Sequence, residues 1–196
     1  MTSSHAIGIL PVSFASAVHD LSSFHWDKRI HIQEREPPSR IAPFAAAIEA
    51  DIDPGDHMAH GRLILLHDPC GQESWGGDFR CVTYAQAEVS PEMIHDPFLA
   101  DVGWSWLTDA LAACGADAVG ECGTVTTTSS TPFGTKSEEE QRSHIEIRAS
   151  WTPLLDADHP FSDHLQAWQE LLREISGLPP QDPRIIPLPT RAAQRR

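Results

Sequence analysis

Residues 79–111, FRCVTYAQAEVSPEMIHDPFLADVGWSWLTDAL, contain the change of pattern that decides the fold. The first part, Phe79–Val89, has the pattern of a strand. After the Ser-Pro pair the apolar residues recur at helical spacing, which predicts a helix with Asp101 as its N-cap and Gly115 at its end. The chain therefore passes from a strand to a helix within this one stretch.

The segments on either side predict two further helices and five further strands. The helices are expected at Ser13–Phe24 and Ser162–Ser176, and the strands at Arg29–Glu34, Phe44–Ile52, Gly61–His67, Gly123–Ser130 and His144–Trp151. The alanines of Phe44–Ile52 fit a helix equally well, so both readings of that segment stay open. The turn-rich DPCGQESWGG between Gly61–His67 and Phe79–Val89 predicts a hairpin.

Strands that cluster between helices, without strict alternation, predict the α+β class. We expect a single domain over residues 12–177, with an antiparallel sheet covered on one face by about three helices. The order of elements resembles that of small secretion-chaperone-like folds. Residues 1–11 are expected to form a flexible N-terminus, and residues 178–196 a disordered tail rich in proline and arginine.

Composition and apolar patterning favour the cytoplasm. The longest strongly apolar run, around Leu63–Leu66, is far shorter than the ~20 residues that span a bilayer. The apolar patch near the N-terminus has no Lys or Arg before it, so we expect neither a secretory signal nor membrane insertion. The four cysteines form no CxxC pair, which predicts free and partly buried thiols.

The net charge of −14 disfavours direct binding of nucleic acid by the folded body. An acidic surface repels phosphate backbones, which are attracted by clusters of lysine and arginine. The exception is the segment Arg184–Arg196, which holds four arginines and no acid.

No complete catalytic, metal or nucleotide motif occurs in the chain. The most concentrated set of metal-ligand types is Asp53, Asp56, His57, His60, His67 and Cys70. Its spacing matches no standard zinc site, and Arg62 stands where a calcium loop needs a glutamate. The segment GWSWL is not a nucleophile elbow, because that motif needs a glycine where this chain has Leu107. We therefore predict no metal, no cofactor and no catalytic residue.

The tryptophans are the better indication of a functional surface. Trp75 lies in the expected turn, and Trp104 and Trp106 lie about 200° apart around their helix. The pair is therefore not expected to point into one core. Trp106 is predicted either at a binding interface, where tryptophan is enriched, or in a second buried layer.

A second group of candidates lies on and before the strand that starts at Phe79. Arg80 is expected on the same face as Tyr84, either binding an anionic group or extending its charge to solvent at a sheet edge. His67 and Asp68 fit a base and its orienting carboxylate, although Asp68 followed by Pro69 also fits a plain turn.

Four sequence motifs resemble those of a known family: GRLILLHDP, FRCVTY, DVGWSWLTDAL and EIRASWTPL, in that order. On these motifs the stretch from about Phe14 to Trp151 resembles the actinobacterial domain-of-unknown-function family numbered three thousand. The resemblance implies no reaction. It does imply a link to RNA metabolism, because genes of that family lie near a ribonuclease of the D type.

The leading functional hypothesis is a non-enzymatic cytoplasmic adaptor that presents an aromatic surface near Trp75, Trp104 and Trp106 to a protein partner or to itself. The alternative is a small-molecule-binding protein or enzyme with a pocket near His67, Asp68 and Arg80. A third hypothesis assigns the arginine tail to the regulation of an RNA-processing enzyme.

Overall fold

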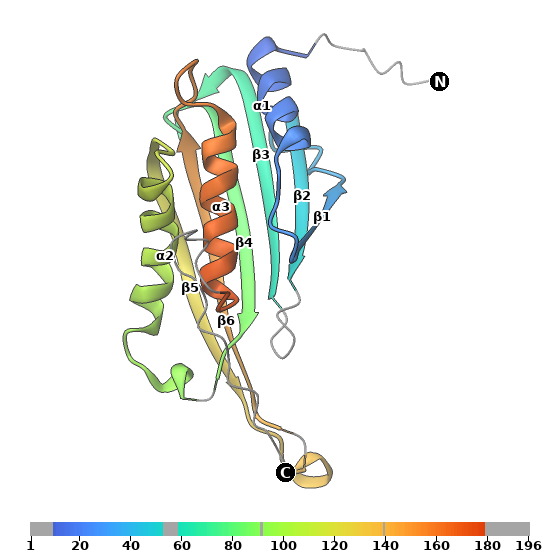
Figure 1. Cartoon of the computed structure of the whole chain (residues 1–196), viewed down its shortest axis with the longest axis vertical. Coiled ribbons are helices and arrows are strands. Elements are labelled where there is room, and N and C mark those ends of the chain that lie inside the picture. The colour runs from blue at the N-terminus through green and yellow to red at the C-terminus, as the bar shows by residue number, and fades with distance from the viewer. Residues whose placement is uncertain (1–9, 53–58, 91, 139, 179–196) are drawn as a thin grey trace, which may run out of the picture.

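The computed structural model describes residues 10–52, 59–90, 92–138 and 140–178. In chain order these residues form α1 (Val12–Ser23), β1 (Ile30–Arg35), β2 (Phe44–Ile52), β3 (Ala59–Gln72), β4 (Gly77–Glu88), the 3-10 turn η1 (Met93–His95), α2 (Leu99–Ala113), β5 (Ala118–Ser130), the 3-10 turn η2 (Gly134–Lys136), β6 (Arg142–Pro153) and α3 (Phe161–Ile175) (Figure 1). The predicted α+β class is confirmed.

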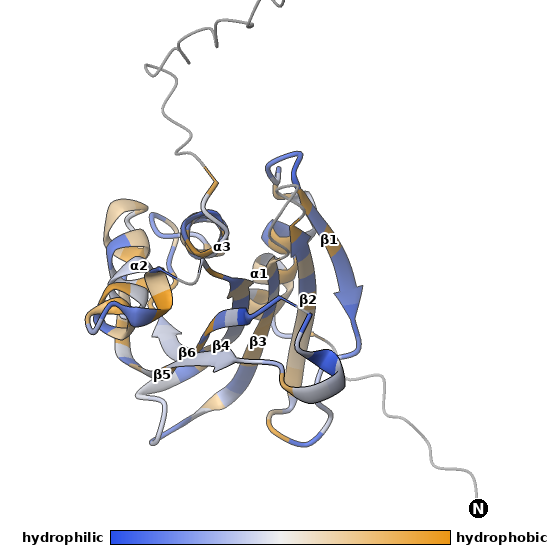
Figure 2. Cartoon of the chain, turned by 90° about the horizontal axis from the view of Figure 1, so that it is seen from below, coloured by the Kyte–Doolittle hydropathy of each residue, from blue (hydrophilic) through white to orange (hydrophobic). Residues whose placement is uncertain are grey.

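All six strands belong to one sheet, in the order β1-β2-β3-β4-β6-β5. Each neighbouring pair is antiparallel. The three helices lie on the same side of this sheet, as predicted, and no helix of the described chain covers the opposite side (Figure 2). We call that uncovered side the open face.

The core lies between the sheet and the helices. Ile145, Ile147 and Trp151 of β6 are fully buried there, which confirms the predicted alternation. The indole N–H of Trp168, on α3, donates to the Thr83 hydroxyl of β4 at 2.8 Å. This buried bond fixes α3 over the centre of the sheet, because an unpaired indole N–H would be costly there.

Segment Phe44–Ile52 is a strand, which settles the open choice between strand and helix. Each of its residues is paired with β3, from Phe44 opposite His67 to Ile52 opposite Ala59. Ile48, Ala50 and Ile52 turn towards the core, and Ala47, Glu49 and Asp51 alternate with them on the other face. Pairing on both edges overrides the helical propensity of the alanines.

Three predicted boundaries are wrong. The helix α2 begins at Leu99 with Phe98 at the N-cap and no side-chain cap, so Asp101 lies in the first turn instead of at the N-cap. Strand β3 continues to Gln72, so the hairpin turn is much shorter than the ten-residue DPCGQESWGG. Strand β5 begins at Ala118, well before the predicted Gly123.

Some predictions fall on residues outside the described part of the chain. These are most of the expected flexible N-terminus, nearly all of the expected proline- and arginine-rich tail, and Asp53, Asp56 and His57. Within the described residues, no helix is long and apolar enough to cross a membrane.

Candidate binding site on the open face of the sheet

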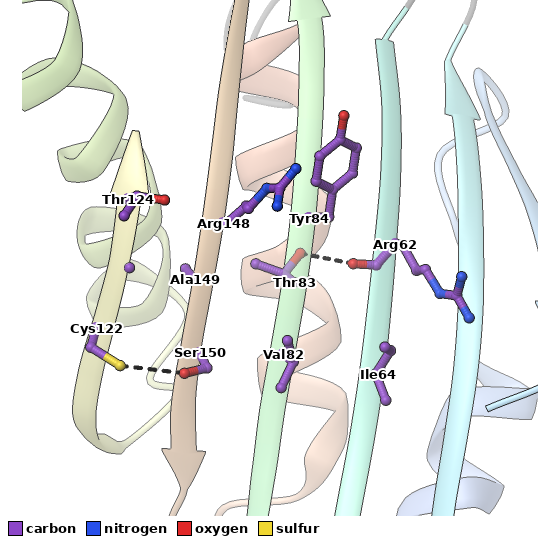
Figure 3. A pocket seen from close by; sticks show the side chains of 11 residues that line it. Arg62, Ile64, Val82, Thr83, Tyr84, Cys122, Thr124, Arg148, Ala149 and Ser150 are labelled. Atoms are coloured by element: carbon purple, nitrogen blue, oxygen red, sulfur yellow. Dashed lines mark hydrogen bonds between the residues drawn. The ribbon is translucent and has the colours of Figure 1, made fainter. Parts of the chain in front are cut away.

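The open face carries a pocket of about 660 Å³ that spans four strands (Figure 3). Two neighbouring rows of side chains cross it. One row is Ile64, Val82, Ser150 and Cys122, and the other is Arg62, Tyr84, Arg148 and Thr124. The alternation of a strand sends these side chains to one face while their neighbours enter the core. The pocket is therefore a direct product of the sheet pairing.

Tyr84 is the aromatic centre of the second row. The Arg148 guanidinium lies over its ring, 5.5 Å from the centroid, and the phenol donates to the Gln86 side-chain oxygen at 2.8 Å. Partial burial raises the pKa of Tyr84, and Glu146 raises it further. The phenol therefore stays neutral at physiological pH and offers a stacking surface with a polar tip.

Arg62 extends from the same row towards β2 (Figure 3). Its guanidinium lies 3.6 Å from a Glu49 oxygen and donates to the Glu36 carbonyl at 3.2 Å. Its Nε is buried and has no hydrogen-bond partner among the described residues. An unsatisfied buried donor is destabilising, so a ligand acceptor that reached this atom would gain that free energy.

Arg80 lies on the same face of β4 as Val82, next to the pocket but not in its lining, and is only 8% exposed. It donates to the hydroxyls of Thr152 at 3.0 Å and Ser150 at 2.7 Å, to the Gly120 carbonyl at 3.0 Å and to the Cys122 sulfur at 3.2 Å. Every one of these acceptors is neutral. The alternative of a side chain extended to solvent at a sheet edge is wrong, because β4 is an inner strand and this guanidinium joins it to β5 and β6.

His67, Asp68 and Arg80 do not form the predicted pocket. His67 pairs with Phe79 and Leu66 pairs with Arg80, so His67 and Arg80 lie on opposite faces of the sheet. The His67 ring is 1% exposed, stacks on Phe79 at 4.2 Å and hydrogen-bonds the Asp78 carbonyl at 3.1 Å.

The Asp68 carboxylate accepts hydrogen bonds from the Cys70 N–H and the Gln72 amide, within the irregular part of β3 between His67 and Gln72. The predicted base and orienting carboxylate are therefore not paired. That part of the alternative hypothesis is wrong.

Both tryptophans of α2 are partly buried and pack against the core. The expectation that they would not face one core is wrong, because Gly103 and Leu107 form the buried stripe and the two rings lie on its flanks. A Cβ added at Gly123 would lie 2.8 Å from the Trp104 ring, so this glycine lets the ring rest on β5.

Trp75 lies in the β3–β4 turn, and its carbonyl accepts a hydrogen bond from Thr152 at 2.6 Å. Thr152 also accepts from Arg80, so the turn is linked to the buried cation beside the pocket. A binding role for Trp75, Trp104 and Trp106 stays a prediction.

Sequence reasoning identified Tyr84 but missed most of the pocket. The missed residues are Arg62, Ile64, Val82, Cys122, Thr124, Arg148 and Ser150. The available signal was the half of each alternating strand that faces away from the core, which the sequence shows one strand at a time. Which strands lie side by side was not visible, because β6 enters the sheet between β4 and β5.

The four cysteines are free thiols, as predicted. Complete burial strongly raises the pKa of Cys81, which makes that thiol inert, whereas Cys122 is exposed at the pocket. No group of three His, Cys, Asp or Glu side chains comes together as a metal cluster within the part of the chain that the structure describes.

The fold and the pocket define an α+β protein whose six-stranded sheet is covered by helices on one face only. The chain belongs to the family described as "Protein of unknown function (DUF3000)", whose model matches residues 10–185. No curated protein and no solved structure matches the chain. The likeness to secretion chaperones therefore remains a prediction from the order of elements.

Proposed function

We propose that this chain is a non-enzymatic protein-binding module that takes up an extended acidic segment of a partner on the open face of its sheet. The observation that carries the proposal is the pocket of about 660 Å³ across four strands, with Tyr84 and arginines in its lining. Protein interfaces concentrate their binding free energy in tyrosine, tryptophan and arginine side chains that are surrounded by weaker contacts.

The lining fits a partner side chain that is apolar or aromatic. Ile64 and Val82 lie side by side in the first row and provide an apolar floor, and Tyr84 stands next to them in the second row. Ser150 and Thr124 add hydroxyl groups along the other side. A pocket of this kind, apolar with a few placed polar groups, is typical of a recognition site.

The charges around the pocket favour an acidic partner. Arg62 and Arg148 are each matched by one glutamate, Glu49 and Glu146 respectively, whereas all the hydrogen bonds of buried Arg80 go to neutral acceptors. These three arginines and two glutamates leave a positive balance at and beside the pocket, in a chain with a net charge of −14. A short acidic segment covers only this region, while a long nucleic acid would also meet the acidic surface around it.

The proposal places the main contact on the open face instead of on the tryptophans. The half-buried rings of Trp104 and Trp106 support a structural role on the helix-covered side. Trp75 is linked to the proposed site through Thr152 and Arg80, which donates to the pocket residue Ser150. A cytoplasmic location is part of the proposal and is supported by the four free thiols, which suit a reducing compartment.

The test is a selection of displayed random peptides on the full chain, followed by affinity measurements with the enriched peptides. We expect enrichment of aspartate and glutamate around an apolar or aromatic residue. Tyr84→Ala and Arg148→Ala should each weaken binding about tenfold or more. The matched control is Arg142→Ala, because Arg142 is exposed on the same strand but lies outside the pocket.

Enriched peptides without acidic residues, or peptides whose affinity is the same for wild type and Tyr84→Ala, would refute this function. Loss of binding in the Arg142→Ala control as well would show that general charge, and not the pocket, is responsible.

A further inference from the structure

The outer edge of the sheet suggests a second interaction surface, which adjoins the pocket at Cys122 and Thr124. Strand β5 ends the strand order, and within the described chain it pairs only with β6 (Figure 1). It is 13 residues long, and every residue from Val119 to Ser130 except Val125 is exposed. Its outward backbone N–H and C=O groups therefore form a long row open to pairing.

This edge lacks the features that usually protect an edge strand. From Cys122 to Ser130 the sequence CGTVTTTSS contains no charge and no proline, and its pairing with β6 continues without interruption. The opposite edge, β1, has only six residues and includes Glu34 and Arg35. Natural sheets protect exposed edges with short strands, charges, prolines or bulges. On β5 the one bulge, between Val119 and Cys122, lies before the uncharged segment.

We propose that β5 pairs with β5 of a second copy of this chain, antiparallel and centred on Thr126. A two-fold axis makes such an interface self-complementary. On one face Thr126 meets Thr126, Thr124 meets Thr128, and Cys122 meets Ser130. No charge meets a like charge in this register, and cross-strand threonine pairs are favourable.

Exposed apolar side chains at the two ends of the strand favour a second copy over an unrelated strand. Val119, near the start of β5, is 40% exposed, and Phe133, just beyond its end, is 80% exposed. Antiparallel self-pairing brings the start of one β5 beside the end of the other. Each end of the interface then brings Val119 of one copy beside Phe133 of the other, and burial removes both side chains from water.

The experiment is sedimentation equilibrium of the full chain over about 1 to 100 µM, the range in which a moderate dimer dissociates. Wild type should be a dimer in the upper part of this range. Thr126→Lys should weaken dimerisation about tenfold or more, because each lysine meets its own copy at the two-fold axis. Thr126 is exposed, so the monomer fold should persist, as circular dichroism would verify.

Thr128→Lys, on the same face of β5, is a second variant with the same expected result if the first fails to fold. Ser137→Lys is the control, since it adds the same charge at an exposed position after η2. A wild-type chain that stays monomeric at every concentration overturns the proposal. So does a dimer that is equally stable in a folded Thr126→Lys or Thr128→Lys variant. A wild-type chain that forms the dimer but binds no acidic peptide would count against the proposed function and not against the β5 interface.

Discussion

At the scale of single residues, buried polar side chains determine how the protein responds to pH. His164, on α3, accepts a hydrogen bond from the Trp151 N–H at 3.2 Å within the core. Burial lowers the pKa of His164 from 6.5 to about 4. The folded protein therefore holds this imidazole neutral, and the unfolded chain binds its proton first as the pH falls.

The stability contributed by neutral His164 should be complete above pH 6.5 and should be lost progressively as the pH falls towards 4. The loss should reach about 3 kcal/mol in the free energy of unfolding. His164→Gln retains an acceptor for Trp151 but has no proton to bind. Urea denaturation at pH 7, 5.5 and 4.5 should give a flatter profile for the variant, and equal slopes for both proteins would contradict the assignment.

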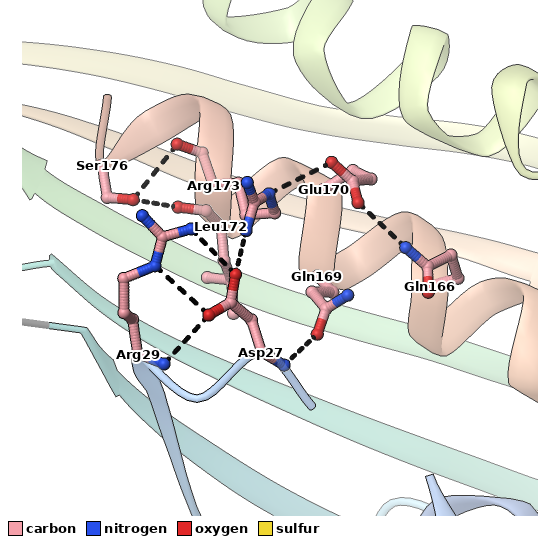
Figure 4. Close-up of polar contacts among 8 residues, drawn as sticks. All are labelled: Asp27, Arg29, Gln166, Gln169, Glu170, Leu172, Arg173 and Ser176. Carbon is pink, nitrogen blue, oxygen red and sulfur yellow. Dashed lines mark hydrogen bonds and ion pairs between the residues drawn. The ribbon is translucent and has the colours of Figure 1, made fainter. Parts of the chain in front are cut away.

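The buried pair of Asp27 and Arg173 joins the start of the sheet to the end of α3 (Figure 4). The Asp27 carboxylate also accepts a hydrogen bond from Arg29. The backbone N–H of Asp27 donates to the Gln169 side-chain oxygen at 2.7 Å. Arg173 is 1% exposed, and its ion pair to Glu170, at 3.5 Å, is longer, so removal of the Asp27 charge would leave the buried guanidinium with much less compensation in a medium of low dielectric constant.

Asp27→Asn should therefore lower the free energy of unfolding by about 3 kcal/mol or more, measured by chemical denaturation. The matched comparison is Glu146→Gln, which breaks the exposed pair with Arg148 and should cost less than about 1 kcal/mol. Similar losses in the two variants would show that the buried pair has no special role.

At the scale of elements, the packing of α3 on the sheet depends on the absence of a side chain at Gly61. A Cβ at this position would lie 2.5 Å from a Leu172 methyl group and 3.1 Å from the Trp168 ring. Strand β3 is thus in close contact with the helix at this point. The close approach is what allows the Trp168 indole to reach Thr83.

Gly61→Ala should destabilise the protein by roughly 1 to 3 kcal/mol through overpacking. Leu172→Ala should cost about 2 to 5 kcal/mol through the cavity that it leaves. In the double variant the added methyl group enters that cavity, so the total loss should be smaller than the sum of the two single losses. Strict additivity in thermal or urea unfolding would contradict this contact.

The sequence predicts those elements whose pattern is local. The alternation of β6 and the apolar stripe of α3 identified both elements to within one or two residues at most boundaries. The longer β3 and the earlier start of β5 were missed, because pairing with neighbouring strands extends each beyond its own pattern. At α2 the helix begins at Leu99 without a side-chain cap, so a search for a capping residue pointed to Asp101 instead.

At the scale of the whole molecule, the helices cover one face of the sheet and leave the open face without a helix among the described residues (Figure 2). The open-face pocket follows from the strand order, which places Tyr84 of β4 opposite Arg148 of β6. No local sequence pattern reveals that β4 and β6 are neighbours, so the sequence indicated Tyr84 but not the residues that surround it. The same order separates His67 from Arg80, although a pocket was expected around both.

The most direct test of this account maps the contact of an acidic peptide, enriched in the selection, by backbone amide chemical shifts of the full chain. We expect the largest shifts at Ile64, Val82, Tyr84 and Ser150, which line the pocket on three adjacent strands. Shifts centred on Trp104 and Trp106 of α2, with the open face unchanged, would contradict the account and would return the binding surface to the helices.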